Sequence, residues 1–181
     1  MEQPMLRLSP VSADIDSPPD VIQAIRSRRG GTLFDIDRLL LHSPAFAAGW
    51  TAHAGAVRSQ LSLEPRLREL AIVAVSVVME THYEVAIHGR VFLEAGGSQT
   101  QLEALRDIDS AREQTLLFSA TERAAIALAI EMTRSIRVSD STFLTAKEAM
   151  GDPRALVELI GVIATYNMTN RFLMALNFAQ S

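Results

Sequence analysis

The chain has 181 residues, of which 48% are hydrophobic and 21% charged, so it is long enough to bury the core of one globular domain. Its net charge of −4 argues against broad affinity for nucleic acids, because such affinity requires lysines and arginines that neutralise phosphates. The chain has no cysteine, which excludes disulfides, cysteine-based metal sites and any thiol nucleophile.

Nothing in the sequence predicts export or a membrane span. The N-terminal residues have neither the basic region nor the apolar region of a secretory signal. The longest apolar stretches, residues 70–75 and 77–79, are separated by Ser76 and fall far short of the roughly 20 residues that cross a bilayer. We therefore expect a cytoplasmic protein without membrane or nucleic-acid partners.

Helix signals occupy almost the whole chain after a polar N-terminal segment. Residues 1–19 are rich in Pro, Ser and Asp and end in Pro18-Pro19, which predicts an extended arm. Residues 20–181 show helical spacing of apolar residues and no convincing strand pairs or hairpin turns. The sequence therefore predicts a single all-α domain of about seven to nine helices at residues 20–181.

Capping motifs and prolines mark where most of these helices should begin. A Ser, Thr or Asp before the first turn accepts a backbone N–H, and proline fits the first helical position. Gly96-Gly97 should end the helix that carries the central motif. The motifs that predict helix starts are Ser43-Pro44 for a helix to about Leu61, Ser62 with Pro65 in the first turn, Ser98-x-x-Gln101, Ser119-x-x-Glu122 and Asp152-Pro153.

The central motif joins a very apolar segment, residues 69–79, to a group of titratable side chains. Glu84 and His88 are four residues apart, so they can touch on one face of a helix. Titratable groups packed against apolar surroundings are where shifted pKa values, and therefore proton chemistry, are expected. The polar residues that follow the apolar segment are Glu80, Thr81, His82, Tyr83, Glu84 and His88.

Several motifs occur in a characteristic order along residues 28–178. They are Arg28-Arg29-Gly30-Gly31-x-Leu33, Leu41-His42-Ser43-Pro44, Arg66-x-Arg68-Glu69-Leu70, Tyr83-Glu84-x-x-x-His88, Gly96-Gly97-Ser98, Glu158-Leu159 and Tyr166-Asn167-x-x-x-Arg171-Phe172. In this order they resemble the carboxymuconolactone decarboxylase family, which has the AhpD-like fold.

The family resemblance implies one of two chemistries. One branch resembles alkylhydroperoxide reductases, which use a Cys-x-x-Cys pair, a His four residues later and an upstream Glu as a proton relay. When His88 is placed on that His, the thiol positions fall at Thr81 and Glu84, and the relay carboxylate falls at Glu69. A thiol peroxidase needs a thiolate and a partner thiol. The resemblance is therefore to the branch of lactone decarboxylases, which lack redox cysteines.

His88, Glu84 and Glu69 are the candidate catalytic residues. His88 can donate or accept a proton near neutral pH, and Glu84 can either orient His88 or act as the acid or base itself. Glu69 can reach His88 only if the chain breaks near residues 79–82 and folds back. Two alternatives stay open: His88 could be a core histidine satisfied by a carboxylate, and Glu69 could form a structural salt bridge with a neighbouring arginine.

Thr81, Tyr83 and His82 are the candidate substrate-binding residues. The hydroxyl of Thr81 could bind a substrate oxygen, and Tyr83 offers a ring and a hydroxyl, although a structural role for Tyr83 is the alternative. His82 points to a different helix face from His88. His82, Glu84 and His88 therefore lack the same-face spacing of a helical zinc site, and we expect no metal.

We expect cofactor-free proton-transfer chemistry on a small organic acid or lactone. A carboxylate would leave as carbon dioxide, its electrons would enter an enol or enolate, and His88 or Glu84 would deliver the proton. Residues 70–78 would form an apolar wall that favours neutral carbon dioxide over a carboxylate, and no arginine pair is evident that would hold a dicarboxylate. The alternatives are a hydroperoxidase, which the missing thiols disfavour, and a non-catalytic oligomeric protein that binds small ligands.

The C-terminal segment, residues 156–178, predicts a helix that is covered from several directions. Its apolar side chains occupy most sides of the helix, and its polar Tyr166, Asn167 and Arg171 need partners where they are buried. Either another subunit or a central position in the core would meet these needs. The family resemblance implies trimers or hexamers, and we expect a homotrimer or a hexamer.

Overall fold

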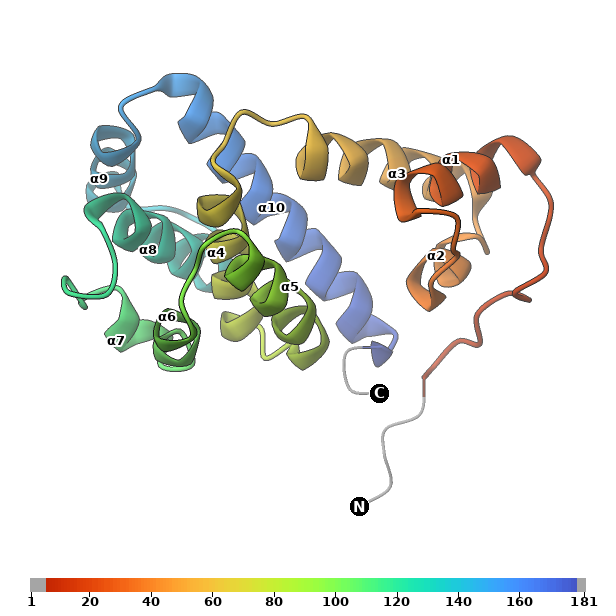
Figure 1. Cartoon of the computed structure of the whole chain (residues 1–181), viewed down its shortest axis with the longest axis horizontal. Helices are drawn as coiled ribbons and strands as arrows, with labels where there is room; N and C mark the ends of the chain where they lie inside the picture. The colour runs from red at the N-terminus through yellow and green to blue at the C-terminus, as the bar shows by residue number, and fades with distance from the viewer. Residues whose placement is uncertain (1–5, 179–181) are drawn as a thin grey trace, which may run out of the picture.

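The computed structural model describes residues 6–178, and α-helices make up most of this part of the chain (Figure 1). No strand occurs among residues 6–178, so the all-α prediction is confirmed. The ten helices of this part exceed the expected seven to nine, because α2, α6 and α7 have only four to six residues each. The helices are α1 (Pro19–Arg29), α2 (Asp35–Leu40), α3 (Pro44–Ser59), α4 (Pro65–Val78), α5 (His82–Glu94), α6 (Gln99–Ala104), α7 (Ile108–Ala111), α8 (Ala120–Arg134), α9 (Asp140–Met150) and α10 (Pro153–Ala175).

Proline begins four of these helices, α1, α3, α4 and α10. The first N–H groups of a helix have no intrahelical partner, so proline loses nothing there. Ser98 and Ser119 form the expected capping boxes of α6 and α8. The prediction for Ser62 is wrong, because Glu64 occupies the N-cap of α4, whereas the hydroxyl of Ser62 donates to Glu158 of α10 at 2.9 Å.

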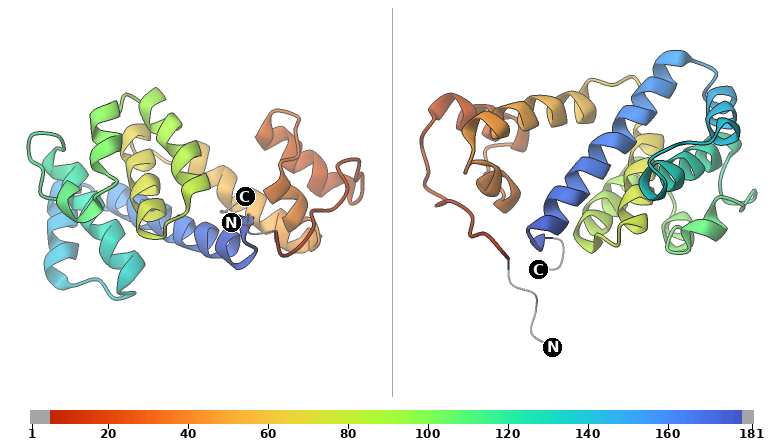
Figure 2. Two further views of the ribbon diagram at one scale, coloured as in Figure 1. Left: turned by 90° about the horizontal axis from the view of Figure 1, so that it is seen from below. Right: turned by 180° about the vertical axis from the view of Figure 1, so that it is seen from behind.

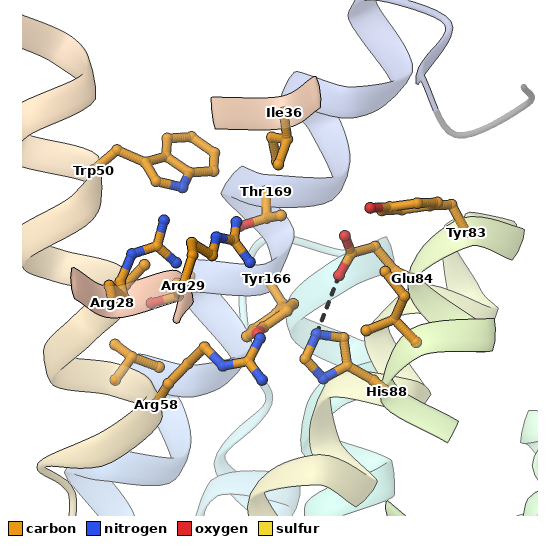
Figure 3. Close-up of a pocket in the computed structure, with 14 residues that line it drawn as sticks. Arg28, Arg29, Ile36, Trp50, Arg58, Tyr83, Glu84, His88, Tyr166 and Thr169 are labelled. Carbon is orange, nitrogen blue, oxygen red and sulfur yellow. Dashed lines mark ion pairs between the residues drawn. The ribbon is translucent and has the colours of Figure 1, made fainter. Parts of the chain in front are cut away.

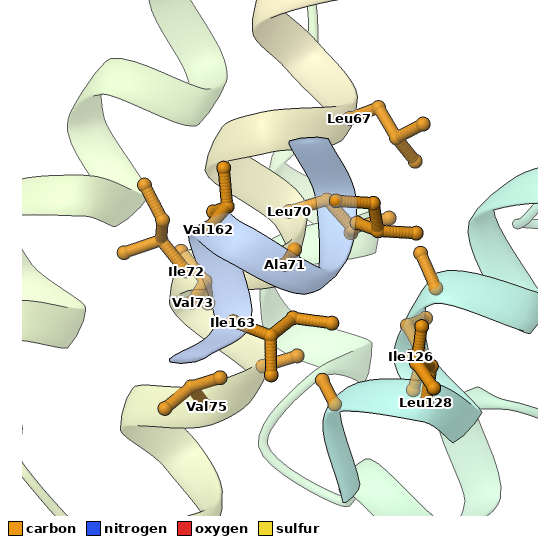
Figure 4. Close-up of a cluster of buried hydrophobic side chains, with 14 of the residues drawn as sticks. Leu67, Leu70, Ala71, Ile72, Val73, Val75, Ile126, Leu128, Val162 and Ile163 are labelled. Atoms are coloured by element: carbon orange, nitrogen blue, oxygen red, sulfur yellow. The ribbon is translucent and has the colours of Figure 1, made fainter. Parts of the chain in front are cut away.

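Helix α4 lies at the centre of the larger of two hydrophobic clusters, with α5, α8 and α10 packed around it (Figure 4). Side chains 70–75 are fully buried. A helix that is covered on every side needs apolar residues on every side, which explains the uninterrupted apolar run. This run therefore belongs to the core of the domain.

A second, smaller hydrophobic cluster joins α1, α2 and α3 to the C-terminal end of α10. In Figures 1 and 2 these three helices form a group of their own beside α10. Residues 6–18 contain no helix, and they are tied to this part of the fold: Arg7 N–H donates to the Leu176 carbonyl, and Arg38 donates to the Val11 carbonyl. Residues 1–5 of the expected arm lie outside the described part.

Helix α10 crosses the molecule as a core helix (Figure 1). Among residues 153–175, the only large apolar side chains that are well exposed are Val157 and Met168. Asn167 donates to Thr133 and to the Ile163 carbonyl. Of the two alternatives that the sequence left open, these hydrogen bonds match a central position of the helix in the core of its own chain. None of the described helices combines the length and apolar character needed to cross a membrane.

Candidate active site

The chain reverses direction after the C-terminal end of α4, so that α5 packs back against α4. Glu80 adopts a left-handed conformation with φ 55°, and the N–H of Thr81 donates to the Ser76 carbonyl at 2.9 Å. This is the hydrogen-bond pattern of a Schellman motif, which ends a helix and reverses the chain. The expected break is therefore present, and it brings Glu69 of α4 beside His88 of α5.

Glu69, His88 and Glu84 form a continuous buried line of charged groups. Nδ1 of His88 lies 2.6 Å from a carboxylate oxygen of Glu69, and Nε2 lies 3.3 Å from Glu84. Arg68 contacts the other Glu69 oxygen at 3.1 Å, and the ring of Tyr166 packs edge-on against His88 with centroids 4.8 Å apart. The side chains of Glu69, His88 and Glu84 are all buried, and they converge as the sequence predicts.

The two carboxylates favour the protonated form of His88. Burial alone would lower the pKa of His88, because burial disfavours an imidazolium, but the hydrogen bonds to Glu69 and Glu84 outweigh it and raise the pKa above 6.5. Burial alone would raise the pKa of Glu69, but the hydrogen bonds from His88 and Arg68 lower it. Both shifts favour the same charge pair, an imidazolium on His88 against an ionised Glu69.

The sequence left open that Glu69 forms only a structural salt bridge with a neighbouring arginine, and the structure shows this salt bridge together with a second contact. Arg68 forms a salt bridge with Glu69, whereas Arg66 pairs with Glu122 of α8 at 2.5 Å. Glu69 therefore uses one oxygen for Arg68 and the other for His88. A salt bridge and a contact to the histidine coexist in the same carboxylate.

Glu84 and His88 form one side of a pocket that is bounded by α1, α2, α3, α5 and α10 (Figure 3). The pocket contains about 550 Å³ of empty space, including the part that opens to solvent. Polar side chains of α10, among them Thr165 and Thr169, complete the wall near Tyr166. The apolar lining consists of Ile36, Trp50, Ala54, Val57 and Ile87.

Tyr83 is the only one of the three expected substrate-binding residues that the structure places at the pocket. Its ring packs edge-on against Phe178 with centroids 5.0 Å apart, and burial raises the pKa of its hydroxyl. Thr81 is buried at the N-cap of α5 outside the pocket lining, and its hydroxyl donates to the Met79 carbonyl at 3.5 Å. His82 is exposed, because it lies on another face of α5.

Two further properties of the pocket differ from the sequence-based expectation. The apolar wall does not come from residues 70–78, whose apolar side chains pack into the core, but from the side chains of α2, α3 and α5 named above. Three arginines, Arg28, Arg29 and Arg58, also line the pocket. They come from α1 and α3, across the pocket from α5, and the side chain of Arg58 points toward Tyr166 and His88 in Figure 3. Only the Arg28-Arg29 motif offered a sequence signal for this side, and it lies far from His88 in the chain.

A sequence profile described as the carboxymuconolactone decarboxylase family matches residues 44–131, the segment that contains Glu69, Glu84 and His88. This segment of the chain belongs to the family. No curated protein matches the chain significantly. Family membership agrees with the order of motifs in the sequence and with a site that contains the family's Glu and His but no cysteine.

Solved structures show that this family member has the AhpD-like fold. An AhpD-core, uncharacterized peroxidase-related protein from Ralstonia eutropha JMP134 is 17% identical, with a TM-score of 0.77 over 98% of this chain and 93% of that chain. A similar protein from Silicibacter sp. TM1040 is 18% identical, with a TM-score of 0.73 over 98% and 88%. The debrominase Bmp8, in complex with 2,3,4-tribromopyrrole, is 15% identical, with a TM-score of 0.77 over 97% and 92%.

Proposed function

We propose that this protein catalyses a cofactor-free decarboxylation, or a closely related lyase reaction, on a small organic acid or lactone. The observation that carries this proposal is the buried Glu69–His88–Glu84 line at the edge of a pocket, in a chain without a thiol. Such an array can hold a proton on His88 and deliver it within the pocket.

The raised pKa of His88 favours the role of proton donor. In the proposed step, the bond between the substrate carbon and its carboxylate breaks, and carbon dioxide leaves. The electron pair enters the adjoining π system as an enolate, and the proton passes to the enolate carbon from His88 or through Glu84. Solvent then returns one proton to the site, so the net reaction consumes one proton and releases one carbon dioxide. Glu69 keeps the imidazole ring oriented from its other nitrogen, 2.6 Å away.

The apolar part of the pocket supports loss of a neutral product. A carboxylate that leaves water for the side chains of Trp50, Val57 and Ile87 loses hydration, whereas carbon dioxide loses little. In the transition state the carboxylate charge moves into the ring or chain of the substrate. The apolar lining therefore destabilises the transition state less than it destabilises the bound starting acid. This difference lowers the barrier.

Thiol-dependent hydroperoxidase chemistry has no nucleophile in this chain, because the positions of the two thiols hold Thr81 and Glu84. A small-ligand-binding protein without catalysis remains the competing function. It would use the same pocket, but replacing His88 would change only binding. The two functions therefore differ in an observable product rather than in structure.

The test is a set of small unsaturated acids and lactone acids with a ¹³C-labelled carboxylate, incubated with the protein in D₂O. We expect ¹³C-labelled carbon dioxide and a product with one deuterium on the carbon next to the lost carboxylate or conjugated with it. His88→Gln should slow release by about 100-fold or more, as expected for loss of a general acid. Arg90→Gln, an exposed residue of α5 outside the pocket, is the control and should leave the rate unchanged.

A wild-type rate equal to that of His88→Gln would contradict the proposal. Acids that raise the melting temperature but release no carbon dioxide would instead support the non-catalytic binding protein.

A further inference from the structure

Tyr166 of α10 lies in the wall of the pocket beside His88. Its side chain is buried and lines the pocket, and its ring packs edge-on against the imidazole with centroids 4.8 Å apart. In Figure 3 the side chain of Tyr166 is drawn next to His88, and the guanidinium of Arg58 points toward both. The tyrosine therefore borders the part of the pocket that His88 also borders.

The hydroxyl of Tyr166 has no acceptor within the described part of the chain. Among residues 6–178 its side chain forms no hydrogen bond, and only its backbone carbonyl accepts one from a side chain, that of Asn170. The neighbouring Arg58 cannot accept the hydroxyl proton, because a guanidinium only donates hydrogen bonds. Both ring nitrogens of His88 already face carboxylates. A buried hydroxyl needs a partner, so the acceptor has to come from the pocket.

Two other hydroxyls that line the pocket are placed differently. The hydroxyl of Thr165 donates to the Gly161 carbonyl at 2.7 Å and contacts His53 at 2.8 Å, so the protein itself satisfies it. Tyr83 is half-buried, and its ring packs against Phe178 rather than against His88. Of the two tyrosines in the chain, only Tyr166 therefore has its ring against the candidate proton donor.

Burial keeps the hydroxyl of Tyr166 protonated. It raises the pKa of this group well above the ordinary value of 10.0, because a buried phenolate would lose its hydration, and the positive charge of Arg58 offsets only part of this effect. Tyr166 therefore does not compete with His88 as a source of protons. Its neutral hydroxyl can donate a hydrogen bond and keep its proton.

We propose that Tyr166 is a further catalytic residue, whose hydroxyl donates a hydrogen bond to the substrate oxygen that becomes negative when the enolate forms. This assignment rests on the proposed function. The substrate class is an acid or lactone acid in which a carbonyl group is placed to accept the electron pair of the departing carboxylate. A donor aimed at an oxygen where charge develops lowers the barrier, because it binds the transition state more strongly than the starting acid.

The hydrogen bond from Tyr166 fits a balanced sequence of steps. As the bond to the carboxylate breaks, its electron pair forms a carbon–carbon double bond, and the π electrons of the carbonyl move onto its oxygen. The hydroxyl of Tyr166 donates to this oxygen without giving up its proton. His88 then protonates the carbon, and the carbonyl re-forms. Tyr166 ends the reaction as it began, and solvent returns one proton to the site.

The first experiment compares a lactone enolate with an uncharged lactone, so it needs no turnover. Tetronate, the ionised enol of a small lactone, and butenolide, a neutral lactone of the same ring size, are titrated by calorimetry into wild type, Tyr166→Phe, Tyr83→Phe and the control Arg90→Gln. We expect wild type and Arg90→Gln to bind tetronate more tightly than butenolide. Tyr166→Phe should lose about tenfold or more of the affinity for tetronate, as for a hydrogen bond to a charged group, and little of the affinity for butenolide.

Tyr166→Phe keeps the ring and its contact with His88, so its melting temperature should stay close to that of wild type. Tetronate that binds wild type no more tightly than butenolide, or that binds wild type and Tyr166→Phe equally, would overturn the proposal. Loss of the tetronate preference in Tyr83→Phe but not in Tyr166→Phe would also overturn it, because the donor would then be the other tyrosine.

Turnover provides a second, separate measurement. On an acid that releases labelled carbon dioxide, Tyr166→Phe should lower kcat by at least about tenfold. KM and the shape of the pH profile should stay close to those of wild type, because the hydroxyl acts in the transition state and is not the group that titrates. A change confined to KM would contradict the role. If wild type releases no carbon dioxide from any acid, the proposed function fails, whereas the tetronate titration still decides whether the hydroxyl of Tyr166 binds an anionic oxygen.

Discussion

At the scale of single residues, His88 defines the chemistry because two buried carboxylates contact its two ring nitrogens. Its pKa is raised above 6.5 in the folded protein. The pairing therefore stabilises the fold fully below pH 6.5, and this contribution is lost as the pH rises through the raised pKa. Glu69 behaves in the opposite sense: its pKa lies below 4.5, so its contribution is present above pH 4.5 and is lost as the pH falls.

The sequence predicted that Glu69, Glu84 and His88 come together, but it did not predict the arginines that line the pocket. Glu84 and His88 could be paired because they lie four positions apart on a helix, and Glu69 entered through the family resemblance. Arg58 carried no such signal, because it lies on α3 and reaches the pocket only through the packing of α1 and α3. The expectation that Thr81 and His82 bind the substrate was not met, because at the start of α5 both side chains lie outside the pocket lining.

At the scale of helices, local signals located most starts and ends correctly. The capping boxes at Ser98 and Ser119 succeeded because the residues involved are three apart and need no tertiary contact. The prediction for Ser62 was wrong because Pro65 is the first helical residue of α4, which makes Glu64 the N-cap. The additional short helices have too few residues to produce a recognisable periodicity.

The turn between α4 and α5 contains strain that a single substitution should relieve. Glu80 is exposed and left-handed, at the C′ position where glycine is usual. The left-handed conformation costs about 1–2 kcal/mol for a residue with a Cβ, and glycine loses about 0.5–1 kcal/mol of this gain through chain entropy. We expect Glu80→Gly to raise the free energy of unfolding by about 0.5–1 kcal/mol, measured by urea denaturation.

Glu80→Ala is the matched control, because it removes the side chain but keeps the Cβ. It should show no comparable gain. Equal midpoints for the glycine and alanine variants would mean that the left-handed conformation is not the source of strain.

At the scale of the whole molecule, the pocket forms where the two hydrophobic clusters meet. The larger cluster holds α4 and α5, which carry Glu69, Glu84 and His88, and the smaller cluster holds α1 to α3, which carry the arginines. Burial of α10 within its own chain removes the main sequence argument for an interface formed by that helix. An exposed apolar area remains between α3 and α10, where Phe46 and Met168 flank Trp50.

We propose that the protein forms a homotrimer or a hexamer and that this area between α3 and α10 contributes to the contact. Met168→Asp should then reduce the mass measured by light scattering at micromolar concentration, because the interface would bury an unpaired charge. Val157→Asp, at an exposed apolar position near the start of the same helix, should leave the assembly intact. A wild-type mass near 19.8 kDa, that of one chain, would contradict the assembly.

The central claim, that His88 is held as a proton donor between two buried carboxylates, is tested most directly by titrating its imidazole with ¹⁵N NMR. The other three histidines of the chain provide comparison signals in the same spectra, and His88→Gln assigns the resonance. We expect His88 to titrate with a midpoint above pH 6.5, and we expect Glu84→Gln to lower this midpoint, because one of the two carboxylates that raise its pKa is removed. A midpoint at or below pH 6.5, unchanged in Glu84→Gln, would contradict this account of the site.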